Sequence, residues 1–130
     1  MPGTLLLDSG GLSRLHLKDR RVAALVRAAA EEGVRVGTTA MTVIEADCAR
    51  IHPARIRWAL SRVDVHGVTR DVGDRAAALL REHGLHGHKY AIDAALAAIA
   101  RSVPGPVTVL ASDPEDLALL CGSQVVVVSP

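Results

Sequence analysis

Aromatic residues are nearly absent from this chain. They make up 2% of it, as one Trp and one Tyr with no Phe, although the hydrophobic fraction is 49%. The interior must therefore be built from Ala, Leu, Val and Ile. Such residues suit helices that pack on both faces of a parallel sheet.

Long apolar runs and export signals are also missing. No uninterrupted apolar run reaches the roughly 18 residues of a membrane helix, and the start "MPGTLLLDSGG" has no basic leader. The two cysteines, Cys48 and Cys121, each lie in an apolar pattern, so we expect two buried thiols rather than a disulfide. These features predict a cytoplasmic protein without a membrane segment. Its 130 residues suffice for one domain with its own core.

The charges are almost balanced, with a formal net charge of +1. This neither requires nor excludes a nucleic-acid partner. Most of the basic residues are Arg, which can bind phosphate or carboxylate with two parallel hydrogen bonds. An Arg-rich composition can equally reflect the base content of a genome.

Strand and helix patterns alternate along the chain. Strands are predicted at 4–8, 34–38, 63–68, 106–112 and 124–130. Helices are predicted at 19–33, 39–52, 54–63, 70–84, 89–101 and 114–122. This alternation implies right-handed crossovers and a mostly parallel sheet. Ligands of such sheets bind at the carboxyl ends of the strands.

Four carboxylates interrupt the apolar patterns. Asp8 and Asp113 follow two predicted strands, so both should point into the crevice at the carboxyl edge of the sheet. Glu45 and Asp93 lie on the apolar faces of predicted helices, so both should face inward. Two carboxylates about 4 Å apart repel by roughly 4 kcal/mol at an effective dielectric of about 20. A cluster of four therefore needs protons or a cation, and oxygen ligands select Mg²⁺ or Mn²⁺.

Each acid also has a purely structural explanation. Asp8 could cap a helix that begins just after it, and Asp113 precedes a proline, which is typical of an N-cap. Asp93 lies near a helix start, where the helix dipole favours an anion. Two pairs match the capping-box pattern: Thr42 with Glu45, and Ser112 with Glu115. A divalent metal explains the four acids together better than these separate roles do.

Three histidines crowd the segment before Asp93: His83, His86 and His88. A zinc site would need a spacing such as H-x₃₋₅-H alongside cysteines, and both cysteines lie in apolar patterns. The first histidine instead suits a helix C-terminus. We therefore expect Asp93, not a histidine, to be the metal ligand. The other two histidines and Lys89 would form a basic rim near the site.

A Mg²⁺ site of this kind is suited to hydrolysis of a phosphodiester. Four segments carry the acids in order: "LLLDSGGLSRL", "TTAMTVIEADCAR", "HKYAIDAALAAIA" and "VLASDPEDLALL". With these motifs, over nearly the whole chain, the sequence resembles the PIN-domain ribonucleases. It is most similar to the VapC-type toxins of bacterial toxin–antitoxin pairs.

The resemblance implies one PIN domain over residues 1–130. Its fold would be PIN-like, a doubly wound (Rossmannoid) three-layer α/β/α arrangement with a parallel sheet of about five strands in the order 3-2-1-4-5. It implies a Mg²⁺- or Mn²⁺-dependent endoribonuclease toxin, a VapB-type antitoxin that covers the site, and a homodimer. The implied catalytic and metal-binding residues are Asp8, Glu45, Asp93 and Asp113, with Ser112 and Asp116 as candidate supporting residues.

The sequence departs from the family pattern at two positions. Gly10 stands where the family often has Thr or Ser, and Leu117 stands where it often has an aromatic residue. The scarcity of aromatic rings also removes the usual stacking platforms for single-stranded RNA. Binding should therefore rely on phosphate contacts. Candidates for RNA or antitoxin contacts are Arg14, Arg50 and Lys89, then Arg55, Arg57 and Arg62, although a solvated helix face would look the same. Trp58 is expected in the core or at a dimer contact.

Three other functions stay open. A housekeeping PIN-domain nuclease could use the same site to process structured RNA. A Mg²⁺-dependent phosphotransfer domain, similar to a receiver, could accept a phosphoryl group on Asp8 or Asp113, but it would not need Glu45 and Asp93. A degenerate scaffold would only bind a partner, and the presence of all four acids argues against it.

Overall fold

The structure is a computed structural model that describes residues 2–130. Five parallel strands form one sheet in the order β3-β2-β1-β4-β5. The strands are β1 Thr4–Leu7, β2 Arg35–Thr39, β3 Asp64–His66, β4 Val107–Leu110 and β5 Val125–Val128. The helices are α1 Ser9–His16, α2 Arg20–Glu31, α3 Ala40–Ala46, α4 Pro53–Leu60, α5 Arg70–Glu82, α6 Gly87–Ala100 and α7 Pro114–Cys121. The predicted doubly wound parallel sheet and its strand order 3-2-1-4-5 are confirmed.

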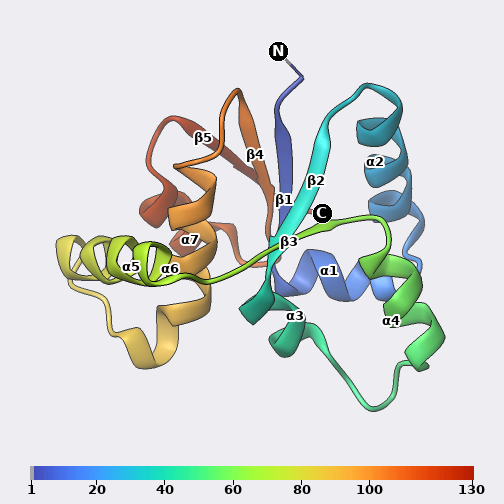
Figure 1. Cartoon of the computed structure of the whole chain (residues 1–130), viewed down its shortest axis with the longest axis horizontal. Coiled ribbons are helices and arrows are strands. Elements are labelled where there is room, and N and C mark those ends of the chain that lie inside the picture. The colour runs from blue at the N-terminus through green and yellow to red at the C-terminus, as the bar shows by residue number, and fades with distance from the viewer. Residues whose placement is uncertain (1) are drawn as a thin grey trace.

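Helices cover the sheet on both faces, as Figure 1 shows. One core joins the sheet to α1, α2 and α4, and the other joins it to α5, α6 and α7. Strand β1 serves both cores, since Leu6 points to one and Leu7 to the other. The cores consist largely of Leu, Val and Ala, as the composition predicted.

Helix α6 is the buried helix that the apolar pattern predicted. Every residue from Ala94 to Ala100 is at most 3% exposed. The first turns of the helix are more open, and Asp93 stands just before the buried stretch. The helix therefore carries its one carboxylate at the border between the core and the surface.

The site is positioned by the central strands of the sheet. In the register of β1 and β4, Leu7 is paired with Leu110, so Asp8 and the residues after β4 come together at the carboxyl edge. The chain leaves β1 toward β2 on one side, while β4 lies on the other side. This is the switch point at which doubly wound sheets bind ligands.

The predicted helix at 39–52 was wrong in its length. Helix α3 ends at Ala46, because Asp47 has extended backbone angles (φ −66°, ψ 137°). Its buried residues are Thr42 and Ala46, whereas Ile44 is 75% exposed. The apolar face on which the longer helix was predicted therefore does not form.

The shorter helix also explains why one of the two cysteines is exposed. Cys48 lies in the irregular segment after α3 and is exposed, so the expectation of a buried thiol there was wrong. Cys121 is buried at the end of α7, as expected. Among residues 2–130, no helix is long and apolar enough to span a membrane.

Candidate active site

The four predicted carboxylates line one cavity of about 270 Å³ at the carboxyl edge of the sheet. Asp8 follows β1, Glu45 comes from α3, Asp93 from α6 and Asp113 from the start of α7. Five more residues line the cavity: Ser9, Gly10, Lys89, Ile92 and Ser112. We call this cavity the carboxylate pocket. Four segments that are distant in the sequence thus bring their acids to one place.

Asp8 is fixed by two backbone hydrogen bonds. Its Oδ1 accepts from the N–H of Gly11 at 2.8 Å, which caps α1, and its Oδ2 accepts from the N–H of Ser112 at 3.0 Å. Burial raises the pKa of Asp8, the backbone N–H groups oppose that rise, and the charge of Glu45 adds to it. The helix-cap explanation of Asp8 is therefore correct, and the same cap holds the carboxylate at the pocket.

The pKa of Asp93 is affected by four neighbouring acids. Burial is the largest cause that raises its pKa to about 6, followed by the charges of Asp8, Glu45, Asp116 and Asp113. A carboxyl group with this pKa exchanges its proton close to neutral pH. The mutual repulsion is what a bound cation would relieve.

Asp113 is not engaged as a helix cap. It occupies the N-cap position of α7, but its side chain makes no capping hydrogen bond. The competing structural explanation, a capping bond, is thus not realised, and the carboxylate is left at the exposed rim of the pocket. The neighbouring Ser112 is also exposed and lines the same rim.

Glu45 reaches the pocket from the solvent side. It was expected to face inward, but it is exposed, so that prediction was wrong. The reason is the packing of α3, which buries Thr42 and Ala46 and turns the adjacent Glu45 outward. The N-cap of α3 is Thr39, whose Oγ1 accepts from the N–H of Thr42 at 3.0 Å. Thr42 is therefore not the N-cap that a Thr42/Glu45 capping box requires.

The chemistry of the donors fits a hard divalent cation. The pocket offers carboxylate and hydroxyl oxygens, which Mg²⁺ and Mn²⁺ prefer, and the charges of the other acids add to the burial that raises the pKa of Asp93. Within residues 2–130, however, no three His, Cys, Asp or Glu side chains stand together as a ready set of metal ligands. The pocket thus has the donor set of a Mg²⁺ site without a preformed cage. Mg²⁺ usually keeps several waters and needs few protein ligands.

The predicted basic rim consists of Lys89 without the histidines. Lys89 lines the pocket, whereas His86 and His88 do not. His83 is the C-cap residue of α5, the position predicted for it. Arg14 and Arg50 are exposed outside the pocket lining, and Arg14 lies 4.0 Å from Asp19.

Gly10 has a role that the sequence did not reveal. A methyl group at Gly10 would overlap the Oγ and Cβ of Ser112 and lie 3.4 Å from Oδ1 of Asp8. The departure from the family pattern at Gly10 is thus matched to Ser112, whose side chain fills the space. No local signal could predict this, because the two residues belong to opposite ends of the chain.

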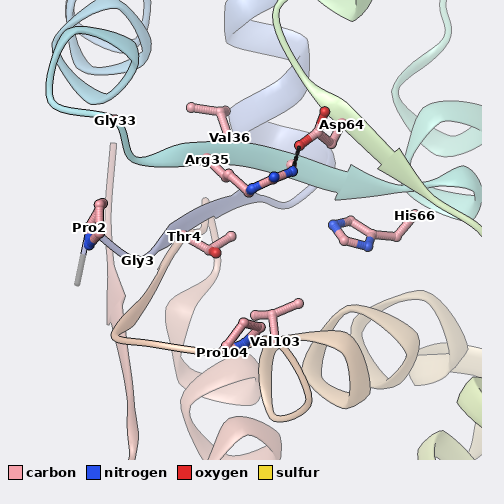
Figure 2. Close-up of a pocket in the computed structure, with 11 residues that line it drawn as sticks. Pro2, Gly3, Thr4, Gly33, Arg35, Val36, Asp64, His66, Val103 and Pro104 are labelled. Atoms are coloured by element: carbon pink, nitrogen blue, oxygen red, sulfur yellow. Dashed lines mark ion pairs between the residues drawn. The ribbon is translucent and has the colours of Figure 1, made fainter.

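A larger cavity of about 410 Å³ lies elsewhere and lacks all four acids. Figure 2 shows it between the starts of β1 and β2 and the Val103–Pro104 segment. Its two opposite charges, Arg35 and Asp64, face each other at 3.5 Å. Because these charges already pair, the carboxylate pocket is the better candidate for chemistry.

Comparison with known proteins supports the fold. No family model matches the sequence, and no curated protein matches it. The fold is nevertheless that of a known PIN-like α/β/α class, since a solved structure matches it over almost its whole length. That structure is the crystal structure of VapBC2 from Rickettsia felis bound to a DNA fragment from their promoter. The TM-score is 0.69 at 10% identity, covering 97% of this chain and 98% of that chain. At this identity the likeness establishes the fold alone.

Proposed function

We propose that this chain is a metal-dependent endoribonuclease and the toxin component of a type II toxin–antitoxin system. The observation that carries the proposal is the convergence of Asp8, Glu45, Asp93 and Asp113 on one pocket, where their charges act on Asp93. The fold shared with a chain of a VapBC2 structure supports the toxin role.

The four acids have different proposed roles, because their environments differ. Asp8 is held rigidly by the N–H groups of Gly11 and Ser112, so its carboxylate is preorganised. Asp93 lies at the border of the core with the other acids around it, so its charge is one that a bound cation would compensate. Glu45 and Asp113 complete the donor set from the exposed rim. A Mg²⁺ or Mn²⁺ ion held by these carboxylates would polarise the phosphodiester and make water more acidic.

The phosphotransfer alternative is less well supported. Of its two candidate acceptors, Asp8 is a poor one, because both of its oxygens accept backbone hydrogen bonds and its side chain is buried. Asp113 is exposed and makes no capping bond, so it is the acceptor that this alternative would have to use. A phosphotransfer function also gives no reason for Glu45 and Asp93 to share the pocket with Asp8. A housekeeping nuclease would use the same chemistry and differs only in its biological role.

The test combines cleavage with growth. Asp8→Asn and Asp93→Asn should each reduce Mn²⁺-dependent RNA cleavage by roughly 100-fold or more, and a chelator should do the same to the unaltered protein. Asp74→Asn, on the exposed surface of α5, is the matched control and should cleave normally. Cleavage that persists in both pocket variants would contradict the proposal.

Growth separates the toxin from a housekeeping nuclease. Expression of the unaltered chain should arrest growth, and expression of Asp8→Asn should not. A chain that cleaves RNA but leaves growth unaffected would favour the housekeeping role.

We propose that a VapB-type antitoxin covers the carboxylate pocket, as the resemblance implies, and that part of it also occupies a groove between α2 and α4. The groove, of about 580 Å³, has an apolar floor that includes Leu15, Val26 and Trp58. Lys18 and Arg62 lie 4.8 and 4.9 Å from the centre of the Trp58 ring. An apolar floor with cations at its edge fits an amphipathic helix with acidic flanks. Trp58 packs on the α1/α2/α4 core, one of its two predicted places, and also lines this groove.

We propose that the homodimer forms through β5. This edge strand is Val125–Val128, and Val126 is 58% exposed on its surface. No charged residue lies from residue 117 to residue 130, whereas the opposite edge strand carries Asp64. Edge strands are normally protected by charges. An uncharged edge can pair with a second copy of itself, since no like charges meet across a two-fold axis.

A further inference from the structure

Lys89 is a cation that lines an acidic pocket without pairing to it. The residue lies in the first turn of α6 and lines the carboxylate pocket together with the four acids. Across residues 2–130, the ion pairs within 4.0 Å are four Arg–Asp pairs, and none involves Lys89. Its ammonium group therefore stays available for another anion, although four carboxylates are nearby.

Tyr90 gives the ammonium group its resting place. Nζ of Lys89 lies 5.1 Å from the centre of the Tyr90 ring, within the range of a cation–π contact. Tyr90 is half-buried, so its ring is held by the protein while part of it stays open. The ammonium group thus lies over this ring, and none of the ion pairs of the described residues includes it.

A polyanion needs such a cation at this place. A phosphodiester that approaches four carboxylates is repelled, and the repulsion is strong where water is partly excluded. A bound metal acts on the phosphate that is cut, but the next phosphate along the strand still faces the acids. Lysine binds phosphate as a point charge and needs no particular orientation. Among the described residues that line the pocket, Lys89 alone is basic.

We propose that Lys89 binds a backbone phosphate of single-stranded RNA next to the one that is cut, and that Tyr90 is the positioning residue for its ammonium group. The proposal rests on the proposed nuclease function. It adds a phosphate subsite on the first turn of α6 to the four-carboxylate pocket.

Arg81 provides a matched control. It is an exposed cation in the last turn of α5, and it does not line the carboxylate pocket. It belongs to none of the Arg–Asp ion pairs of the described residues. Arg81→Met thus removes one positive charge outside the site.

The experiment measures steady-state cleavage of a fluorescent single-stranded RNA with Mn²⁺ at several KCl concentrations. Lys89→Met should raise KM about tenfold and leave kcat within about twofold, as expected when a charge-assisted contact to substrate is lost. RNA binding is measured by fluorescence anisotropy in the presence of chelator. The slope of the logarithm of the binding constant against the logarithm of the KCl concentration should become shallower by about 0.7. Lys89→Arg should restore both values, and Arg81→Met should change neither.

Tyr90 is tested through Lys89. Tyr90→Leu should raise KM about threefold, within the range of an exposed cation–π contact, and Tyr90→Phe should not. In the double variant Lys89→Met/Tyr90→Leu, the effect should equal that of Lys89→Met alone, because the ring acts through the lysine. Additive effects would overturn the positioning role of Tyr90.

The two proposals fail in different ways. If the unaltered protein cuts RNA and Lys89→Met has the same KM and salt slope, the phosphate subsite is refuted and the nuclease function stands. If the unaltered protein neither binds nor cuts RNA, both proposals fall. Melting temperatures equal to that of the unaltered protein show that the fold of each variant is intact, and we expect this for Lys89→Met because Lys89 is exposed.

Discussion

Replacing Asp93 by Asn should make the metal-free protein more stable at neutral pH, although it removes a proposed catalytic group. Burial and four neighbouring acids raise the pKa of Asp93 from 3.8 to about 6. Its ionised form is therefore unfavourable in the folded protein. Asn keeps the shape of the side chain and carries no charge.

The size of the effect follows from the pKa shift. A shift of this size corresponds to about 3 kcal/mol if it is fully expressed in the free energy of unfolding. Because Asp93 is only half-buried, water screens part of the repulsion, and we expect a gain of about 1–2 kcal/mol at pH 7.

The pH dependence has a definite sign. The folded pKa is raised, so the stability linked to Asp93 is complete below about pH 4 and is lost as the pH rises through about 6. The gain in the free energy of unfolding from Asp93→Asn should accordingly be near zero at pH 4, increase between pH 4 and 6, and stay constant above that range.

Urea denaturation of both proteins from pH 4 to pH 8 in chelator measures this gain. Asp74→Asn, in an exposed ion pair with Arg70, should change stability by only a few tenths of a kcal/mol at every pH, within the roughly 0–1 kcal/mol of surface pairs. Added Mn²⁺ should stabilise the unaltered protein and have less effect on Asp93→Asn. The reasoning is refuted if Asp93→Asn is less stable at pH 7, or if its gain does not vary with pH.

Three further predictions concern positions around the site, the core and the sheet edge. Gly10→Ala should destabilise the protein by about 1–3 kcal/mol, because the added methyl group overlaps Ser112, although Ala usually stabilises a helix. Adding Ser112→Gly should recover the lost stability, as measured by urea titration. His16 is fully buried, and neither of its ring nitrogens is hydrogen-bonded to a described residue. Burial lowers the pKa of His16, and the charge of Asp47 opposes this. The protein should therefore lose stability as the pH falls below about 6.5. His16→Leu should remove that loss and add about 1–3 kcal/mol at pH 7; a destabilised variant would contradict this. Val126→Lys should convert a dimer into a monomer in light scattering, and an unchanged dimer would place the interface elsewhere.

Much of the architecture was predictable from local patterns. Alternating strand and helix signals predicted the parallel sheet, and the apolar run at 89–101 predicted the buried α6. Asp8 and Asp113 could be assigned to the carboxyl edge, since each follows a strand. These features depend on side-chain periodicity and on the direction of the strands, and both can be read from neighbouring residues. The roles of the acids as metal ligands stay predictions.

The length of α3 and the orientation of Glu45 were decided by tertiary contacts. The apolar residues Ile44 and Cys48 matched a longer helix, but the chain buries Thr42 and Ala46 instead and leaves the helix at Asp47. Periodicity indicates which side chains share a face, but it does not indicate which face finds a partner.

The details of the pocket were decided by contacts between remote segments. The side chain of Ser112 leaves no room for a methyl group at Gly10, and the N–H of Ser112 holds the carboxylate of Asp8. The pKa of Asp93 is raised by burial and then by the charges of acids on other elements. Sterics and electrostatics act over a few ångströms in space, whatever the separation along the chain. The sequence by itself thus determined the fold and the types of group at the site, and the packing of the sheet and helices decided how those groups meet.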